Sequence, residues 1–266
     1  MNNAEKNLKE FYNNKGWHKN SSSNFYEDSL LWEDNRKVAT DYVSNCRLRL
    51  AKLIEHSCNY NNCDISLDVG CGPIQYSEYQ KYYEKFKENH FLDISQKALD
   101  EASKVAKLNS KFICKSAIEF KDQNKYNTII INHVLYHIDK NEQKNVINNL
   151  INALKSNGKL YITYTNRYSI WNIIFYLPQL IFNLVKSKKR RIYFYTYPIK
   201  WWSQFNYKTK VKKYVLRSIS SRESKLLVPN NSFGKKILNI LFNLEKKFPN
   251  IFLLLGTYYI IEITKK

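Results

Sequence analysis

Glycine, proline and cysteine are scarce in this chain of 266 residues, which contains six Gly, five Pro and five Cys. Any glycine-rich functional loop must therefore be short, and the glycines cluster only at residues 70–72. The cysteines are odd in number and include no CxxC pair or Cys/His cluster, so neither a disulfide framework nor a zinc site is predicted. We expect a reduced protein without a metal; the cysteines are Cys46, Cys58, Cys63, Cys71 and Cys114.

Long hydrophobic runs are also missing. The longest apolar stretch, Ile170 to Val185, is interrupted by Asn172 and Pro178 and falls short of the roughly 20 apolar residues of a spanning helix. The first 17 residues are polar and mixed in charge, unlike a secretory signal. The sequence therefore predicts a cytoplasmic protein.

Acidic residues are rare in the C-terminal part of the chain. Residues 1–150 hold 21 Lys and Arg against 20 Asp and Glu, whereas residues 151–266 hold 22 against three. A biased base composition of the gene would spread the excess Lys evenly, so this asymmetry predicts one strongly positive face that meets an anionic partner. The alternative is a basic surface that is merely solvated.

Hydrophobic periodicity predicts alternating strands and helices in the middle of the chain. Two helices, at 3–14 and 35–56, are expected to come first. The strands that follow are expected at Ile65–Val69, 90–94, 111–114, Thr128–Ile131, Lys159–Thr165 and Tyr258–Thr264, with helices at 77–88, 95–107 and 141–154 and a glycine break at Gly158. This alternation predicts a mostly parallel sheet covered on both faces.

The glycine pair follows the first of these strands directly. In Asp68-Val69-Gly70-Cys71-Gly72 the backbone must turn sharply and approach a ligand closely. The next strand ends about twenty residues later at Asp93, where a carboxylate can accept hydrogen bonds from a ribose diol. A dinucleotide is the weaker alternative, because Gln75 stands where a third glycine would fall and Asp68 would repel a pyrophosphate.

These residues resemble the class I S-adenosylmethionine (SAM) dependent methyltransferases, in their small-molecule branch. Leu67 to Gly72 resembles the first motif of that family and Phe91 to Ser95 the second. Tyr126 to Ile138 resembles the fourth-strand motif, and Leu154 to Leu160 resembles the turn before the fifth strand. Four motifs in order over about 100 residues carry the resemblance.

The resemblance implies an α/β, Rossmann-like methyltransferase fold. Its mostly parallel seven-stranded sheet is flanked by helices, and N-terminal helices and C-terminal helical and aromatic insertions form a cap. The implied domains are an N-terminal helical lid at 1–58, a SAM-binding core at 59–165, and basic acceptor-binding insertions with the last strands of the sheet at 166–266.

The resemblance also implies the residues that bind the cofactor, SAM. Ser116 replaces the Asp that commonly contacts the adenine amino group, and Asn157 replaces a usual Gly whose turn geometry Asn tolerates. Tyr12 and Trp17 either close over SAM or simply pack on the domain. The candidate cofactor-binding residues are Asp68, Gly70, Cys71, Gly72, Asp93, Ile94, Ser116, Ala117, Asn132, His133 and Tyr12.

His133 and His137 are the candidate catalytic bases. Both follow the fourth strand, near the expected position of the transferable methyl group, and His is the natural base near neutral pH. Methyl transfer from a sulfonium needs mainly positioning and removal of a proton, so the alternative is an enzyme without a dedicated base.

The basic C-terminal region is the expected binding region for the methyl acceptor. Ile170 to Val185 with the basic residues of 186–191 resembles an interfacial helix that contacts anionic lipid at the inner membrane face, or else a helix that caps the core. The aromatic residues of 193–205, beside Lys200 and Lys208, suit sugar rings or bases. We expect methyl transfer to O or N of an anionic small or carrier-linked acceptor of surface-glycan biosynthesis. The alternatives are an RNA (tRNA) methyltransferase, a lipid or quinone methyltransferase at a membrane, and a SAM-binding protein without catalysis.

Overall fold

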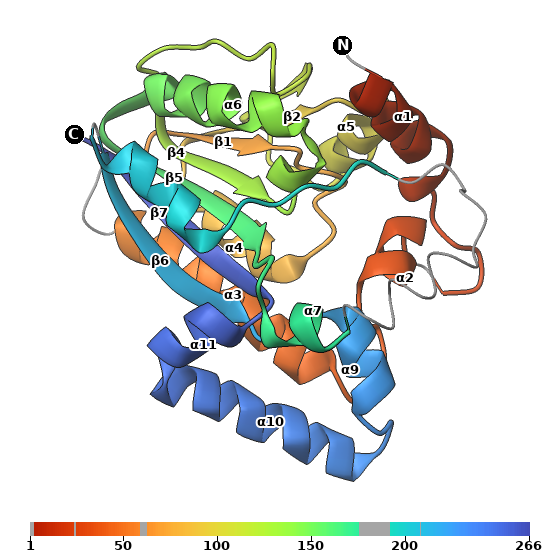
Figure 1. Ribbon diagram of the computed structural model, residues 1–266. Coiled ribbons are helices and arrows are strands. Elements are labelled where there is room, and N and C mark those ends of the chain that lie inside the picture. Colours follow the sequence, from red (N-terminus) through yellow and green to blue (C-terminus); the bar gives the residue numbers. More distant parts are fainter. Residues whose placement is uncertain (1–2, 24, 59–62, 176–191, 208) are drawn as a thin grey trace.

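The computed structural model describes residues 3–23, 25–58, 63–175, 192–207 and 209–266. Its centre is a twisted sheet of seven strands with helices on both faces (Figure 1). The predicted α/β fold with a mostly parallel seven-stranded sheet is confirmed.

The strands run in the order β3-β2-β1-β4-β5-β7-β6 across the sheet. β7 is antiparallel to both of its neighbours, and the pairs from β3 to β5 are parallel. Because the strand order reverses between β1 and β4, their carboxyl ends border a crevice in which ligands of such sheets bind. The strands are β1 (Ile65–Val69), β2 (Glu88–Asp93), β3 (Ser110–Cys114), β4 (Tyr126–Asn132), β5 (Leu154–Thr165), β6 (Thr209–Arg217) and β7 (Tyr258–Lys265).

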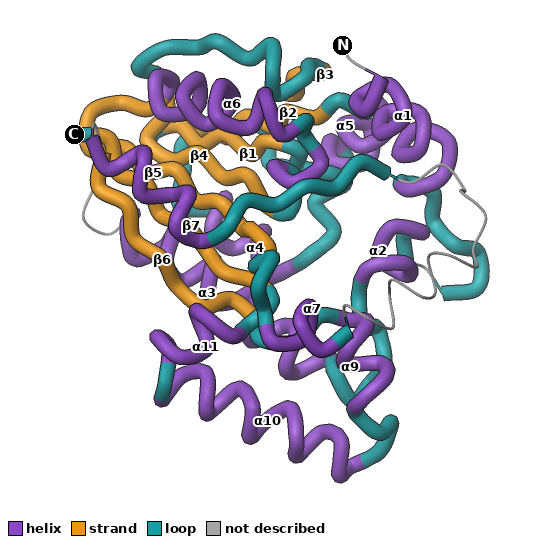
Figure 2. Tube along the Cα trace, in the orientation of Figure 1, coloured by secondary structure: helices purple, strands orange, loops and turns teal. Residues whose placement is uncertain are grey.

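Two helical layers bury the two faces of the sheet (Figure 2). On one face α6 (Lys140–Ala153) packs through Val146 and Leu150, beside the short 3-10 helix η2 (Leu135–His137). On the other face α3 (Thr40–Cys58) and α4 (Ser77–Tyr83) pack through Leu50, Ile54 and Tyr82. α5 (Gln96–Ser103), capped by the Ser95 side chain, lies beside β2 and β3.

The remaining helices come from the N-terminal and C-terminal parts of the chain. The chain begins with α1 (Asn3–Phe11), the π-helical turn η1 (Tyr12–Gly16) and α2 (Glu27–Trp32). Its C-terminal part contributes α7 (Ile170–Ile174), the 3-10 helix η3 (Ile199–Tyr207), α9 (Ser221–Leu227), α10 (Ser232–Lys247) and α11 (Pro249–Leu255).

Several expected boundaries differ from the structure. The glycine break predicted at Gly158 is wrong, because β5 begins at Leu154 and includes Gly158. The register between β4 and β5 shifts at this point, and Asn157 takes the left-handed conformation expected of it, with φ of 62°. A Cβ at Gly158 would lie 2.9 Å from the Lys155 carbonyl oxygen, so the glycine permits close backbone approach within the strand.

Part of the aromatic tract lies in the core and not at a ligand surface. Trp202 is fully buried and donates from Nε1 to the Tyr259 hydroxyl at 3.0 Å, and Phe205 is also buried. These two rings therefore anchor η3 on the sheet. The predicted basic tract at 186–191 and most of Ile170–Val185 lie outside the described residues.

The prediction of a reduced chain without disulfides is wrong for one pair. Cys58 ends α3, and it forms a disulfide with Cys63, just before β1. Their Cα atoms are 5.5 Å apart, within the range that a disulfide requires. An odd cysteine count therefore did not exclude a single local bridge. None of the helices in the described ranges combines the length and hydropathy of a membrane crossing.

Candidate active site

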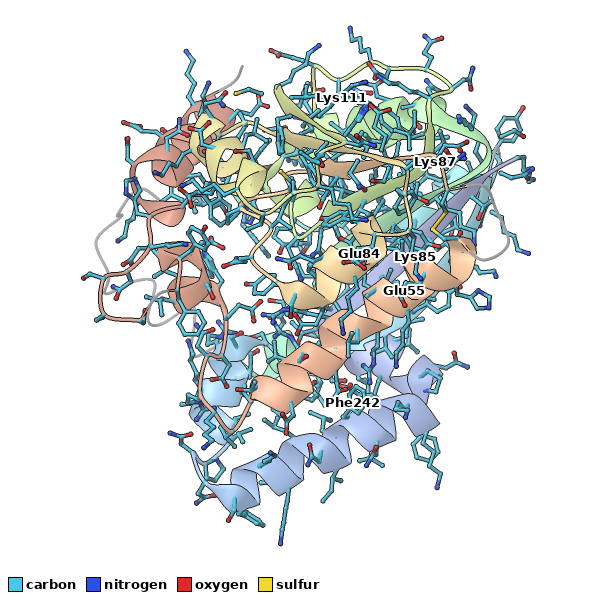
Figure 3. The ribbon with its side chains drawn as sticks, turned by 180° about the vertical axis from the view of Figure 1, so that it is seen from behind. Glu55, Glu84, Lys85, Lys87, Lys111 and Phe242 are labelled. Atoms are coloured by element: carbon cyan, nitrogen blue, oxygen red, sulfur yellow. A yellow bond between two sulfur atoms is a disulfide. The ribbon has the colours of Figure 1, made fainter. Side chains whose placement is uncertain are left out.

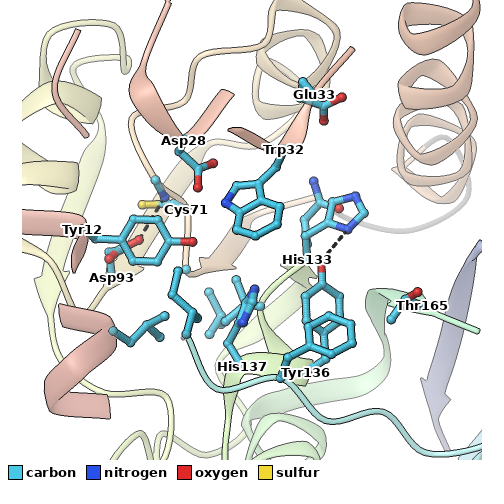
Figure 4. A pocket seen from close by; sticks show the side chains of 18 of the residues that line it. Tyr12, Asp28, Trp32, Glu33, Cys71, Asp93, His133, Tyr136, His137 and Thr165 are labelled. Carbon is cyan, nitrogen blue, oxygen red and sulfur yellow. Dashed lines mark hydrogen bonds between the residues drawn. The ribbon is translucent and has the colours of Figure 1, made fainter. Parts of the chain in front are cut away.

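A cavity of about 1260 Å³ opens at the carboxyl ends of β1, β2, β4 and β5. All the predicted cofactor-binding and catalytic residues line it. Figure 4 shows Tyr12, Asp28, Cys71 and Asp93 at one end, His133, Tyr136 and Thr165 at the other, and Trp32 and His137 between them. We call these the acid end and the histidine end of the cavity.

The glycine turn forms the floor of the acid end. Gly70 and Gly72 have φ of 70° and 57°, in the left-handed region that favours glycine. A Cβ at Gly70 would collide with the Val134 side chain, and one at Gly72 would lie 3.1 Å from the ring of Trp17. The Asp93 carboxylate holds this turn, because it accepts from the backbone N–H of Gly72 at 3.0 Å and of Ser95 at 2.8 Å.

Three carboxyl groups gather around this turn without a basic partner. Burial raises the pKa of Asp68 and Asp28 to about 7 and that of Asp93 to about 6. Among the described residues, none of the three forms an ion pair with Lys, Arg or His. The Tyr83 hydroxyl donates to Asp68 Oδ2, while Oδ1 of Asp68 and Oδ1 of Asp28 are buried without a hydrogen-bond partner. Such a site suits a cationic ligand, since a cation would relieve the cost of ionising the acids.

Asp28 was not among the predicted site residues. It lies in α2, a helix of six residues, and nothing in its sequence context distinguishes it from a solvated acid at a helix start. Only the folded chain brings it beside Tyr12, which stacks on Trp17 with ring centroids 4.7 Å apart.

The N-terminal segment covers the acid end of the cavity. Trp17 lies against Gly72, and Asn13 accepts from the Ser95 hydroxyl at 2.5 Å. The Ser116 hydroxyl, which is predicted to contact adenine, donates to the Glu5 carboxylate of α1. These contacts agree both with a segment that closes over the cofactor and with one that simply packs on the domain. The boundaries at 1–58, 59–165 and 166–266 are still predictions.

The two histidines differ in how their rings are held. His137 donates from Nδ1 to the Tyr193 carbonyl oxygen at 2.9 Å; a carbonyl only accepts, so this bond leaves Nε2 as the unprotonated nitrogen. Nδ1 of His133 lies 3.0 Å from the Tyr136 hydroxyl, which can either donate or accept. Burial lowers the pKa of His137 to about 4 and that of His133 to about 3, so both rings are neutral at pH 7.

The histidine end is bordered by C-terminal residues that belong to none of the sequence motifs. Buried Arg217, at the end of β6, pairs with Glu33 at 3.3 Å beside His133. Arg222 and Lys225 of α9 also line the cavity. Arg222 pairs with Glu223, whereas Lys225 forms no ion pair with a described carboxylate. The cavity is therefore acidic at the glycine turn and carries exposed cations on its α9 rim.

Comparison with known proteins agrees with this geometry. Residues 67–158, from β1 to the first half of β5, match the family described as a methyltransferase domain. The strand order and the glycine turn agree with this match and with the class I SAM-dependent methyltransferase family that the sequence motifs resemble. No protein among the curated sequences matches the chain.

Solved structures with the same fold cover nearly the whole chain at low identity. Magnesium protoporphyrin IX methyltransferase from Synechocystis PCC 6803, with bound SAH, is 11% identical with a TM-score of 0.61, over 97% of this chain and 98% of that one. The N-methyltransferase NodS from Bradyrhizobium japonicum WM9 is 10% identical with a TM-score of 0.54, over 87% and 89%. A SAM-dependent methyltransferase from Archaeoglobus fulgidus is 16% identical with a TM-score of 0.52, over 83% and 94%. These similarities extend the shared fold beyond the matched domain.

Proposed function

We propose that the chain transfers the methyl group of SAM to an oxygen or nitrogen of an anionic, small or carrier-linked acceptor. A sugar or phosphate-bearing intermediate of surface-glycan assembly is the expected acceptor class. The observation that carries the proposal is the polarity of the cavity. At the glycine turn lie buried Asp68 and Asp93 and half-buried Asp28, none of them paired with a described basic side chain, and neutral histidines lie beyond them.

The acid end fits SAM better than a dinucleotide. SAM carries a sulfonium and an ammonium group against one carboxylate, whereas a pyrophosphate would meet the negative charges of Asp68 and Asp93. The free oxygen of Asp68 suits the ammonium group, and Asp93 at the end of β2 suits the ribose hydroxyls. Gly70 and Gly72 allow the cofactor to approach the backbone closely.

The histidine end supplies a base. SAM bound at the acid end offers an electrophilic methyl group to an acceptor placed in line with the sulfonium. His137 presents a neutral Nε2 to the cavity, and the Tyr193 carbonyl stabilises the proton on Nδ1. His137 Nε2 therefore takes the proton that the acceptor O–H or N–H loses as the new bond forms. The structure favours His137 over His133 for this role, because the hydrogen bond of His133 does not fix which nitrogen carries its proton.

The α9 rim supports an anionic acceptor. Lys225 is exposed at the cavity and unpaired with any described carboxylate, and exposed Arg222 lies one helical turn before it. Cations at the rim attract a phosphate or carboxylate group of the acceptor, and they lie at the opposite end from the acids that suit SAM.

Transfer of labelled methyl groups tests the proposal. The protein is incubated with methyl-labelled SAM and a fractionated lysate, and label is measured in small molecules, lipid-linked material and RNA. We expect label in anionic small or carrier-linked molecules, and much less label with the Asp93→Ala variant at the same SAM concentration. Label confined to RNA, or binding of SAM without transfer to any fraction, would contradict the proposal.

A further inference from the structure

The helices α10 and α11 present an apolar surface that no described part of the chain covers. In Figure 1 they lie along the edge of the molecule that is remote from α6. On α10, Phe233 and Ile240 are 62% and 59% exposed; on α11, Ile251 and Leu254 are 52% and 60% exposed. We call these side chains, with Leu244, Phe248 and Leu255, the α10–α11 surface.

α10 is held firmly by its opposite side, so the exposure is not that of a loose helix. Glu245 is fully buried and accepts from Arg49 Nη1 at 2.7 Å and from the Tyr42 hydroxyl at 2.7 Å. Phe242 lies between α10 and α3, as Figure 3 shows, with the Arg49 guanidinium 4.3 Å from its ring centroid. The helix is thus apolar on two sides, and only one of them packs on the core. Phe233, Ile240 and Leu244 share the other side, because they are seven and four residues apart.

The exposed charges that α9, α10 and α11 themselves carry are all positive. Residues 221–256 contain six Lys and Arg and only two acids, Glu223 and Glu245, which are buried and paired. The six cations are all exposed, and Lys235 pairs with Asp41 of α3. The other four lysines form no ion pair with a described carboxylate; they are Lys225, Lys236, Lys246 and Lys247.

We infer that the α10–α11 surface docks on anionic phospholipid bilayers, with its apolar side chains in the interface and its lysines at the headgroups. Exposed Leu, Ile and Phe bordered by lysines is the pattern of an amphipathic helix that lies in such an interface. A second copy of the chain fits less well, because a two-fold contact would place the lysines of the two copies against each other. α10 follows α9 through residues 228–231, so docking would also hold the α9 rim of the cavity near the lipid.

Flotation with vesicles tests this inference without any methyl transfer, so its failure is distinct from failure of the proposed function. The full chain is mixed with vesicles of phosphatidylcholine alone or with about 30% phosphatidylglycerol, and the bound fraction is measured against salt. We expect binding to the anionic vesicles and much weaker binding to the neutral ones. We expect Ile240→Glu/Ile251→Glu to lower the partition coefficient roughly tenfold or more, because it removes inserted apolar groups and adds repelled charges.

Two further variants separate insertion from simple charge attraction. Ile240→Ser/Ile251→Ser adds no charge and should still weaken binding to anionic vesicles. Val105→Glu/Leu108→Glu, at exposed apolar positions beside β3, adds the same two charges elsewhere and should bind like the wild type. Far-ultraviolet circular dichroism and SAM affinity report folding, and we expect both to be unchanged.

Three results would overturn the inference. These are wild-type protein that floats with neither vesicle, serine variants that bind as tightly as the wild type, and self-association in sedimentation that the serine substitutions abolish. The last result would make the surface an interface between two copies of the chain.

Discussion

At the residue scale, the first prediction concerns Asp93, whose two carboxylate oxygens hold the glycine turn through Gly72 and Ser95. Asp93→Ala removes both bonds and the expected acceptor of the ribose hydroxyls, so SAM binding should weaken by about 1–3 kcal/mol. Isothermal titration calorimetry measures this loss. Exposed Asp100→Ala on α5 is the control, and equal effects of the two substitutions would show that Asp93 has no special role.

The second prediction concerns pH. Folding raises the pKa to about 6 for Asp93 and to about 7 for Asp68 and Asp28. These groups therefore stabilise the free protein at low pH, where they are protonated. This stabilisation is lost as the pH rises through these folded-state pKa values. A cationic ligand binds best when the acids are ionised, so SAM affinity should rise between about pH 5 and pH 8 and then level off. Asp68→Asn should flatten this rise. An affinity that falls over the same window would contradict the electrostatic account of the acid end.

The third prediction concerns the base. His137→Asn should lower kcat by about 100-fold to 10,000-fold while leaving SAM affinity nearly unchanged, because it removes the proton acceptor and not a cofactor contact. Once an acceptor is identified, single-turnover methyl transfer measures the loss. His133→Asn serves as the comparison and should lower the rate less. An unchanged rate with His137→Asn would show that no dedicated base is needed.

At the element scale, Glu245 is the group that joins α10 to α3 and to the end of β6. It accepts from Arg49, from the Tyr42 hydroxyl and from the backbone N–H of Ser218. Glu245→Ala leaves the Arg49 guanidinium without its carboxylate, so the free energy of unfolding should fall by about 3–5 kcal/mol. Urea denaturation measures this, with Lys236→Ala as the exposed control on the same helix. A loss equal to that of the control would show that α10 is held by its apolar contacts alone.

The elements that the sequence predicted well are those with a clean hydrophobic pattern. β1, the glycine turn and β2 were predictable because a buried strand must end where Gly70 and Gly72 reverse the chain. β6 was not located, because Lys210, Lys212 and Lys213 interrupt its alternation at the edge of the sheet. Lysines on an edge strand protect it from pairing with another chain, and they also hide it from pattern analysis.

The site residues also divide into those that local sequence patterns predict and those that they do not. Those carried by the motifs from β1 to η2 line the cavity as expected, because the parallel strands bring their carboxyl ends to one edge. Asp28, Arg217 and the α9 rim come from segments distant in sequence, and only tertiary packing brings them to the cavity. Ser116 likewise has a partner that the sequence does not reveal, since Glu5 lies 111 residues earlier in the chain.

At the scale of the whole molecule, the charge asymmetry has a structural meaning. The acids at the glycine turn come from the charge-balanced N-terminal part, and the exposed cations of α9 and α10 come from the basic C-terminal part. One cavity thus joins a cofactor end that suits a cation to a rim that suits an anion. This division explains how a chain with a formal net charge of +20 keeps an acidic pocket that suits a cationic ligand.

Binding of SAM at the acid end of the cavity is measured by calorimetric titration at pH 8. The wild type is titrated separately with SAM, with its demethylated product and with NADH. We expect dissociation constants in the micromolar range for SAM and the product and no measurable heat of binding for NADH. Binding of NADH without binding of SAM would contradict this expectation.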